Sequence, residues 1–230
     1  MLMKPVVDPL FQTLIARMPP LSITEGPWIA GGAARKLWEN NPWTTGDLDV
    51  FFTSGEQLAT WKKIFETSLM VNVQEEFEKE TECMEQEDNT FTVELFNNFK
   101  CLQTKPKNKF YVAHQSDNAI TYRMPGDSPL TGITVQMIKR RFGESVEKVW
   151  DSFDFHNCEF ATDGKTLLAS ESAAWGSLSG ELLLKDSDNT RNLPLRTLKY
   201  HLHGFEASKE LLLTAVEQLT KGGVTWDNDY

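Results

Sequence analysis

Residues 26–52 read GPWIAGGAARKLWENNPWTTGDLDVFF, and this stretch contains the pattern that decides the fold. A short apolar run ends at the pair Gly31-Gly32, and residues 33–39 have the composition of a helix. After a loop punctuated by Pro and Gly, residues 47–52 alternate between carboxylates and apolar side chains before a final Phe pair. The order predicts a strand, a glycine turn, a short helix and a second strand.

The second of these strands carries two carboxylates. Asp47 and Asp49 are at positions i and i+2, which on a strand places both side chains on one face. Two adjacent carboxylates repel each other, and a fold tolerates them where a cation lies between them. Hard oxygen ligands suit Mg²⁺, or Mn²⁺ in its place. Gly31 and Gly32 allow the backbone to approach a ligand closely, and the following helix start offers N–H groups to phosphate. The segment therefore predicts metal-assisted phosphoryl or nucleotidyl transfer. A solvated pair of strand-end aspartates is the alternative interpretation.

This segment resembles the nucleotidyltransferase superfamily of DNA polymerase beta. Within it, the segment is most similar to the class II CCA-adding enzymes and bacterial poly(A) polymerases. That branch carries Gly-Gly-Ala-x-Arg-Asp followed by Asp-x-Asp. Gly31, Gly32, Ala33 and Arg35 match the first motif, whereas Lys36 stands where the branch has Asp. The resemblance implies that the two glycines and Arg35 help bind a nucleoside triphosphate, and that the two aspartates hold the metal.

A second segment, 153–161 (FDFHNCEFA), resembles the family's Arg-Arg-Asp-Phe-Thr-Ile-Asn-Ala motif, and the hairpin signal Asp163-Gly164 follows it. On that resemblance Asp154 is the third carboxylate, a catalytic residue and metal ligand beside the Asp-x-Asp pair. The family's two arginines are Ser152-Phe153 here, which leaves the choice of nucleotide and the activity itself open.

Other residues compete for the third-carboxylate role. Glu94, Asp151 and Glu159 are rivals of Asp154, and Glu94 is the main one because apolar neighbours surround it in a predicted strand. His156 could act as a base, although a packed or hydrogen-bonding histidine is the commoner situation.

A dense basic cluster, residues 139–141 (KRR), follows the predicted strand 133–138. Beside a metal and a triphosphate, Lys139 and Arg140 would bind phosphate oxygens. An ordinary group of charges at a strand end is the alternative.

Charge and composition restrict the function classes. The 230-residue chain has a net charge of −10, and residues 75–94 hold nine acids and one lysine. A chain this acidic is a poor non-specific binder of nucleic acid. No apolar run is long enough to span a bilayer and the N-terminus has no signal-peptide pattern, so we expect a cytoplasmic protein that does not use a membrane. The three cysteines are isolated, which favours reduced thiols over a zinc site.

The predicted fold class is α+β: a nucleotidyltransferase-type mixed sheet of about five strands, flanked by helices, with a short helical C-terminal extension. We expect a catalytic core over residues 1–184, a polar linker, and an extension over residues 193–230. Residues 194–199 (PLRTLK) resemble the start of the helical neck of class II enzymes.

These features predict a metal-dependent nucleotidyltransferase. It would move a nucleoside monophosphate from a nucleoside triphosphate such as ATP to an acceptor hydroxyl, either an RNA 3′ end or another acceptor, and release pyrophosphate. The alternative is a non-catalytic nucleotide-binding or regulatory protein on a degenerate fold of the same type. A metal-dependent phosphohydrolase is a third hypothesis, but it would normally bring histidines near Asp47, and none lies near it in the sequence.

Overall fold

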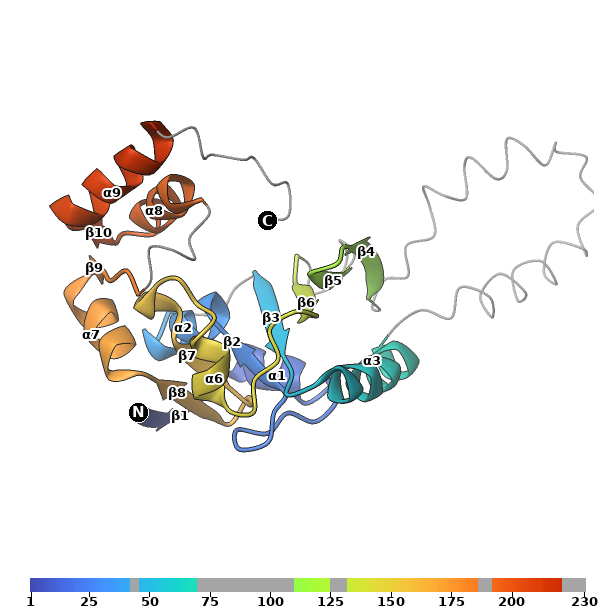
Figure 1. Cartoon of the computed structure of the whole chain (residues 1–230). Coiled ribbons are helices and arrows are strands. Elements are labelled where there is room, and N and C mark those ends of the chain that lie inside the picture. The colour runs from blue at the N-terminus through green and yellow to red at the C-terminus, as the bar shows by residue number, and fades with distance from the viewer. Residues whose placement is uncertain (42–45, 70–109, 125–131, 186–191, 221–230) are drawn as a thin grey trace, which may run out of the picture.

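The computed structural model describes residues 1–41, 46–69, 110–124, 132–185 and 192–220, and Figure 1 shows their arrangement. In this part of the chain the main feature is an eight-stranded mixed sheet. Only the pairing of β3 with β6 is parallel within it. The strands follow one another across the sheet in this order: β1 (Leu2–Pro5), β8 (Thr166–Ala169), β7 (Phe160–Thr162), β2 (Trp28–Ala30), β3 (Asp47–Phe51), β6 (Thr134–Ile138), β5 (Ala119–Arg123) and β4 (Tyr111–Gln115).

The sheet is wider than the sequence predicted. The expectation of about five strands is wrong because β1 and the β7–β8 hairpin extend the sheet beyond β2. The hairpin itself is confirmed: it turns at Gly164, whose φ of +89° suits glycine. The edge strand β1 pairs with β8, from Leu2 opposite Ala169 to Pro5 opposite Thr166. The strand predicted around residues 91–95 lies outside the described residues.

Local hydrogen bonds explain where several helices begin. Asp8 caps the first helix by accepting from the Phe11 N–H at 2.8 Å. Ser54 caps the helix that follows it: its hydroxyl accepts from the Gln57 N–H at 3.1 Å, and the Gln57 side chain accepts from the Thr53 N–H at 2.9 Å. No helix in the described ranges combines the length and apolar character needed to cross a membrane. The helical segments are α1 (Pro9–Ile15), α2 (Gly32–Trp38), α3 (Gly55–Leu69), α6 (Val146–Trp150), the 3-10 turn η1 (His156–Cys158), α7 (Glu171–Ser179), α8 (Leu193–Leu202) and α9 (Lys209–Thr220).

Two hydrophobic clusters cover the two faces of the sheet. Leu48, Val50 and Phe52 belong to the first cluster, with residues of α1, α2 and α3. Phe51 points to the opposite face and belongs to the second cluster, with residues of α6, η1, α8 and α9. Because side chains alternate along a strand, Asp47 and Asp49 lie on the same face as Phe51. The aspartate pair therefore faces the side on which α8 and α9 pack.

The helical extension is joined to the sheet by this second cluster. Tyr200 of α8, Phe205 after it, and Leu211 and Ala215 of α9 are all buried there. A small parallel pair, β9 (Glu181–Leu182) with β10 (Glu206–Ala207), adds a backbone connection. Figure 1 shows α8, α9, β9 and β10 together at one end of the molecule.

Candidate active site

The two aspartates of β3 lie between the strands β2 and β6. Asp49 is opposite Ala30 on β2 and opposite Gln136 on β6. Asp47 is exposed, while Asp49 is half-buried. The strand register confirms that the two carboxylates share a face, and it places Thr134 opposite Asp47 and Gln136 opposite Asp49 on β6.

The charges around Asp47 and Asp49 favour the binding of a cation between the two carboxylates. Burial, and then the negative charge of Asp47, raise the pKa of Asp49 to about 6. Lys199, Arg141 and Arg196 act in the opposite direction on Asp49. The folded chain therefore holds two neighbouring carboxylates at an energetic cost that nearby cations only partly offset.

The glycine pair borders this site through the β2–β3 pairing, since Ala30 precedes Gly31 and lies opposite Asp49. Gly31 has a φ of +83°, a conformation that other residues rarely adopt, and its N–H donates to the Phe160 carbonyl at 2.9 Å. A Cβ atom at Gly31 or Gly32 would meet no atom within 4 Å. Gly32 is exposed, whereas Gly31 is buried, so the turn is open to a ligand at Gly32.

Asp154 does not join the aspartate pair. Its carboxylate forms an ion pair with Arg196 of α8, which includes a hydrogen bond from Nη2 to Oδ1 of 2.8 Å. Burial lowers the pKa of Arg196, but the Asp154 carboxylate together with Tyr200 and Cys158 outweighs burial, so that the pKa of Arg196 is raised. Among the described residues, no group of three or more His, Cys, Asp or Glu side chains is arranged to hold a metal. The structure thus gives the third predicted carboxylate a guanidinium partner, and its role beside Asp47 and Asp49 stays a prediction.

Arg35, which the resemblance assigned to nucleotide binding, is 6% exposed. Its Nε lies 3.8 Å from the Glu39 carboxylate, and its guanidinium lies 4.7 Å from the centre of the Phe205 ring. Its Nε and Nη1 atoms are buried without a hydrogen bond. In this position Arg35 holds α2 against Phe205, which follows α8.

The basic residues 139–141 after β6 do not all interact with the same part of the molecule. Lys139 Nζ donates to the Ser116 carbonyl at 2.7 Å, and Arg140 lies 3.4 Å from the Asp117 carboxylate. Both therefore contact the turn between β4 and β5. Arg141 is the member of the cluster whose charge acts on Asp49. Sequence reasoning named the cluster but did not single out this residue.

Glu159, a rival for the third carboxylate, is buried in a network of its own. Its oxygens contact Lys185 Nζ at 2.7 Å, Ser170 Oγ at 2.6 Å and His156 Nδ1 at 2.9 Å. The other described rival, Asp151, is exposed and lies 3.2 Å from Lys148. Glu94 lies outside the described residues. The geometry gives Glu159 and His156 a structural role in holding η1 against α7.

Lys199 on α8 is a second residue that sequence reasoning missed. It is exposed, and among the cations that act on Asp49 its effect is the largest. The neck-like pattern of residues 194–199 contained the signal, because it placed Arg196 and Lys199 three positions apart on one helix face.

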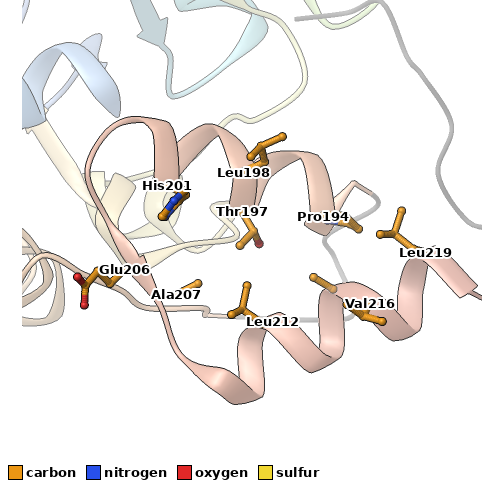
Figure 2. A pocket seen from close by; sticks show the side chains of 10 residues that line it. Pro194, Thr197, Leu198, His201, Glu206, Ala207, Leu212, Val216 and Leu219 are labelled. Carbon is orange, nitrogen blue, oxygen red and sulfur yellow. The ribbon is translucent and has the colours of Figure 1, made fainter.

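A separate groove lies between α8 and α9, with a volume of about 560 Å³. Figure 2 shows side chains from both helices between the two ribbons. None of the predicted site residues lines this groove, so it is distinct from the aspartate site. Its walls are mostly apolar and comprise Pro194, Thr197, Leu198, His201, Glu206, Ala207, Leu212, Ala215, Val216 and Leu219.

The aspartate pair fits a divalent cation. Mg²⁺ in enzyme sites is usually held by one or two carboxylates together with waters and substrate phosphates, rather than by a complete protein cage. Two adjacent carboxylates, one of them exposed and the other with a raised pKa, match that donor set. A third protein carboxylate is not required for such a site.

Comparison with known proteins identifies the family of the chain and solved structures with a similar fold. A family model described as Gabija anti-defense 2 family protein matches residues 5–179. No curated protein matches the sequence.

Solved structures of CCA-adding enzymes are similar to the chain. The Thermotoga maritima CCA-adding enzyme complexed with tRNA is 14% identical with a TM-score of 0.53, covering 96% of this chain and 47% of that one. A complex of a CCA-adding enzyme with CTP is 14% identical with a TM-score of 0.53, covering 97% and 46%. An apo form is 12% identical with a TM-score of 0.52, covering 97% and 49%. The chain thus spans about half the length of these enzymes. At these identities the similarity shows the fold, and it confirms the predicted mixed sheet flanked by helices.

Proposed function

The chain belongs to the Gabija anti-defense 2 family, and from this premise we propose that it is a metal-dependent nucleotidyltransferase. It moves a nucleoside monophosphate from a nucleoside triphosphate to an acceptor hydroxyl and releases pyrophosphate. The observation that carries the proposal is the adjacent pair Asp47 and Asp49 on β3, held on one face of a sheet with the CCA-adding fold. The raised pKa of Asp49 supports it, because a cation between the two carboxylates would relieve their repulsion.

In this proposal Asp47 and Asp49 hold Mg²⁺ or Mn²⁺ together with phosphate oxygens of the nucleotide. When bound, the metal would neutralise the negative charge that develops on the attacking and leaving oxygens. The chain's own residues position the reactants. The exposed Gly32 lies beside the nucleotide, and the acceptor oxygen attacks the α-phosphorus in line, losing its proton to water, as the bond to pyrophosphate breaks.

Asp154 takes a different role in this proposal from the one that the family resemblance implied. Its ion pair with Arg196 fixes α8 next to η1 on the aspartate face. Arg35 supports the same junction from α2. Both residues are positioning residues, because they shape the wall of the site without contacting the reactants.

The acceptor class follows from the fold relatives and the charge. A structurally similar enzyme was solved with tRNA, which makes an RNA 3′-hydroxyl one candidate acceptor. The net charge of −10 disfavours a general electrostatic grip on RNA, so the acceptor would be recognised by shape or by specific contacts. The family description adds that the modified molecule would belong to, or act on, the Gabija defense.

Two measurements test the proposal. Thermal unfolding is followed with ATP, CTP, GTP and UTP, each with and without Mg²⁺ or Mn²⁺. A ligand at one hundred times its Kd stabilises the fold by about 2.7 kcal/mol, so metal-dependent stabilisation by at least one triphosphate is expected. Incubation with each α-labelled nucleotide and a cell extract then identifies the acceptor by its label. Stabilisation by no nucleotide in the presence of metal would contradict the proposal.

A second candidate function is a nucleotide-binding or regulatory protein without catalysis. The observation that favours it is the ion pair of Asp154 with Arg196, together with the finding that no group of three or more His, Cys, Asp or Glu side chains is arranged to hold a metal among the described residues. This candidate predicts metal-dependent nucleotide stabilisation without transfer of label to any acceptor. The two measurements above therefore separate the candidates.

A further inference from the structure

Lys36 on α2 is a charged residue close to the aspartate strand, and the proposed function gives it no role so far. The class II enzymes that this segment resembles have Asp at the position, so this chain carries the opposite charge there. Residues four positions apart share a face of a helix, which places Lys36 one turn after the exposed Gly32. Lys36 is partly exposed, whereas its neighbours Arg35 and Leu37 are buried. Helix α2 therefore presents a lysine on the side of the glycine turn that is open to a ligand.

The Lys36 side chain reaches the start of the strand that carries the aspartates. A Cβ atom placed on Gly46 would lie 3.6 Å from Lys36 Nζ, and Gly46 directly precedes Asp47. Gly46 is itself held beside β6, because its carbonyl accepts from the Thr134 N–H at 3.3 Å. Asp47 is the exposed member of the aspartate pair and the one nearer to this end of β3. The ammonium group of Lys36 therefore lies where the helix after the glycine pair meets the start of β3.

Helix α2 is fixed in place, so the base of the Lys36 side chain has a defined position. Ala34 and Leu37 pack in the first hydrophobic cluster, and the guanidinium of Arg35 lies against an aromatic ring on the other side. Within the described ranges, the ion pair of this helix joins Arg35 to Glu39, and no carboxylate pairs with Lys36. Lys36 is thus a positioned cation whose charge is available to an anionic ligand.

A nucleoside triphosphate needs such a cation. Its phosphates carry several negative charges, and charge-assisted bonds from Lys or Arg are the usual means by which proteins offset those that a divalent cation leaves. In the proposed reaction the α-phosphorus is attacked beside Asp47 and Asp49. Lys36 lies beyond the Asp47 end of this pair, so it is offset from the reacting phosphorus. Lys139 and Arg140, which the sequence favoured for binding phosphate, contact the β4–β5 turn instead.

We propose that Lys36 binds the two phosphates that leave as pyrophosphate, at a subsite between the glycine turn and the start of β3. This inference rests on the proposed nucleotidyl transfer and deepens it by naming the residue that recognises the leaving group. Lys36 Nζ donates hydrogen bonds to oxygens of the β- and γ-phosphates. When the bond to the α-phosphorus breaks, its electron pair stays on pyrophosphate, and the ammonium group offsets part of that charge while keeping its own protons. The ligand class is a pyrophosphate group bound with a divalent cation, either free or within a nucleoside triphosphate.

The test compares ligands that contain the pyrophosphate group with one that lacks it. Dissociation constants are measured by calorimetry with Mg²⁺ for ATP, inorganic pyrophosphate and AMP. We expect Lys36→Met to weaken ATP and pyrophosphate binding by roughly tenfold to a hundredfold, with a much smaller effect on AMP. Lys36→Arg should restore most of the affinity, since it keeps a cation on the same helix face.

Two controls separate a direct contact from a general effect of charge. Lys63→Met removes an exposed lysine of α3, changes the net charge by the same amount and should leave all three dissociation constants unchanged. The measurements are repeated at about 1 M salt, where the Debye length is about 3 Å and distant charges are screened. The ratio between the dissociation constants of Lys36→Met and the wild type should persist there. Thermal unfolding without ligand verifies that each variant is folded.

The outcomes distinguish this inference from the function on which it rests. If the wild-type chain binds neither ATP nor pyrophosphate with Mg²⁺, the proposed function fails. If the wild-type chain binds both and folded Lys36→Met binds them equally well, the inference alone is overturned. An equal loss of affinity for AMP, or an equal loss in Lys63→Met, would also overturn it, because the effect would then not come from a contact with the pyrophosphate group.

Discussion

At the scale of single residues, Asp49 is the central residue of the proposed metal site. Burial and the neighbouring Asp47 raise its pKa to about 6, so the fold holds this carboxylate charged at a cost. We predict that Asp49→Asn abolishes nucleotide transfer and metal-dependent stabilisation, because one of two metal ligands is lost. The folded state should be as stable as wild type or melt roughly 2–4 °C higher, because repulsion is removed. Label incorporation and melting curves are the measurements, and a variant that incorporates label at the wild-type rate would contradict the site.

Glu159 gives a prediction about pH. Burial works to raise its pKa, but hydrogen bonds from Lys185, Ser170 and His156 outweigh burial and keep the pKa below the ordinary value. A carboxyl group whose pKa is lowered by folding stabilises the fold above its unfolded pKa, near 4.5, and this stabilisation is lost as the pH falls through the lower folded value. Between about pH 5 and pH 3 the wild-type chain should therefore lose more stability than Glu159→Gln.

Urea unfolding midpoints at pH 7, 5, 4 and 3 measure this difference. The matched control is Glu56→Gln, at an exposed position of α3. Its urea unfolding midpoint should fall with pH as steeply as that of the wild type. Parallel pH profiles for Glu159→Gln and the wild type would show that the network around Glu159 contributes nothing through its charge.

The sequence predicted some contacts of the site but not others, depending on whether the contact is local in the chain. Asp47 and Asp49 were predictable because two neighbouring strand positions define a shared face without knowledge of any other element. The pairing of Asp154 with Arg196 was not predictable, since it joins residues 42 positions apart and depends on how α8 docks. Lys199 and Arg141 approach Asp49 for the same long-range reason.

At the scale of elements, a largely buried ion pair adds to the hydrophobic contact of α8 with the core. Arg196 and Asp154 are both largely buried, with side chains 19% and 14% exposed. We predict that Arg196→Met costs about 3–5 kcal/mol of unfolding free energy, because it leaves a desolvated carboxylate unpaired. The double variant Asp154→Asn with Arg196→Met should recover a large part of that loss. Denaturant unfolding of the wild type, both single variants and the double variant measures the coupling, and strictly additive costs would mean that the pair does not hold α8 in place.

Elements with a strong local signal were predicted well. Alternation located β3, the Asp163-Gly164 turn located the β7–β8 hairpin, and the Ser54 cap located the start of α3. The edge strand β1 was missed, because a four-residue strand has no pattern of its own and exists through its pairing with β8. The number of strands in the sheet was underestimated because β1 and the β7–β8 hairpin extend it beyond β2.

At the scale of the whole molecule, the two hydrophobic clusters share one sheet, so each face depends on the other. The second cluster includes residues of α8 and α9 as well as Phe155, whose ring centre lies 5.1 Å from that of Tyr200. The sequence divided the chain into a core over residues 1–184 and an extension over residues 193–230. The second cluster contains buried residues from both of these predicted parts.

We therefore predict that a chain ended after residue 192 does not fold stably. Truncation removes Tyr200, Phe205, Leu211 and Ala215 from the second cluster and exposes the groups beneath them. Each large apolar side chain in such a cluster contributes about 1.5–3 kcal/mol by its burial, and the sum approaches the net stability of an ordinary domain, about 5–15 kcal/mol. Loss of Arg196 also leaves Asp154 unpaired. Size-exclusion chromatography and thermal unfolding of the truncated and full chains test this, and a monomeric truncated chain with a cooperative transition near that of the full chain would show that the sheet and its first cluster suffice.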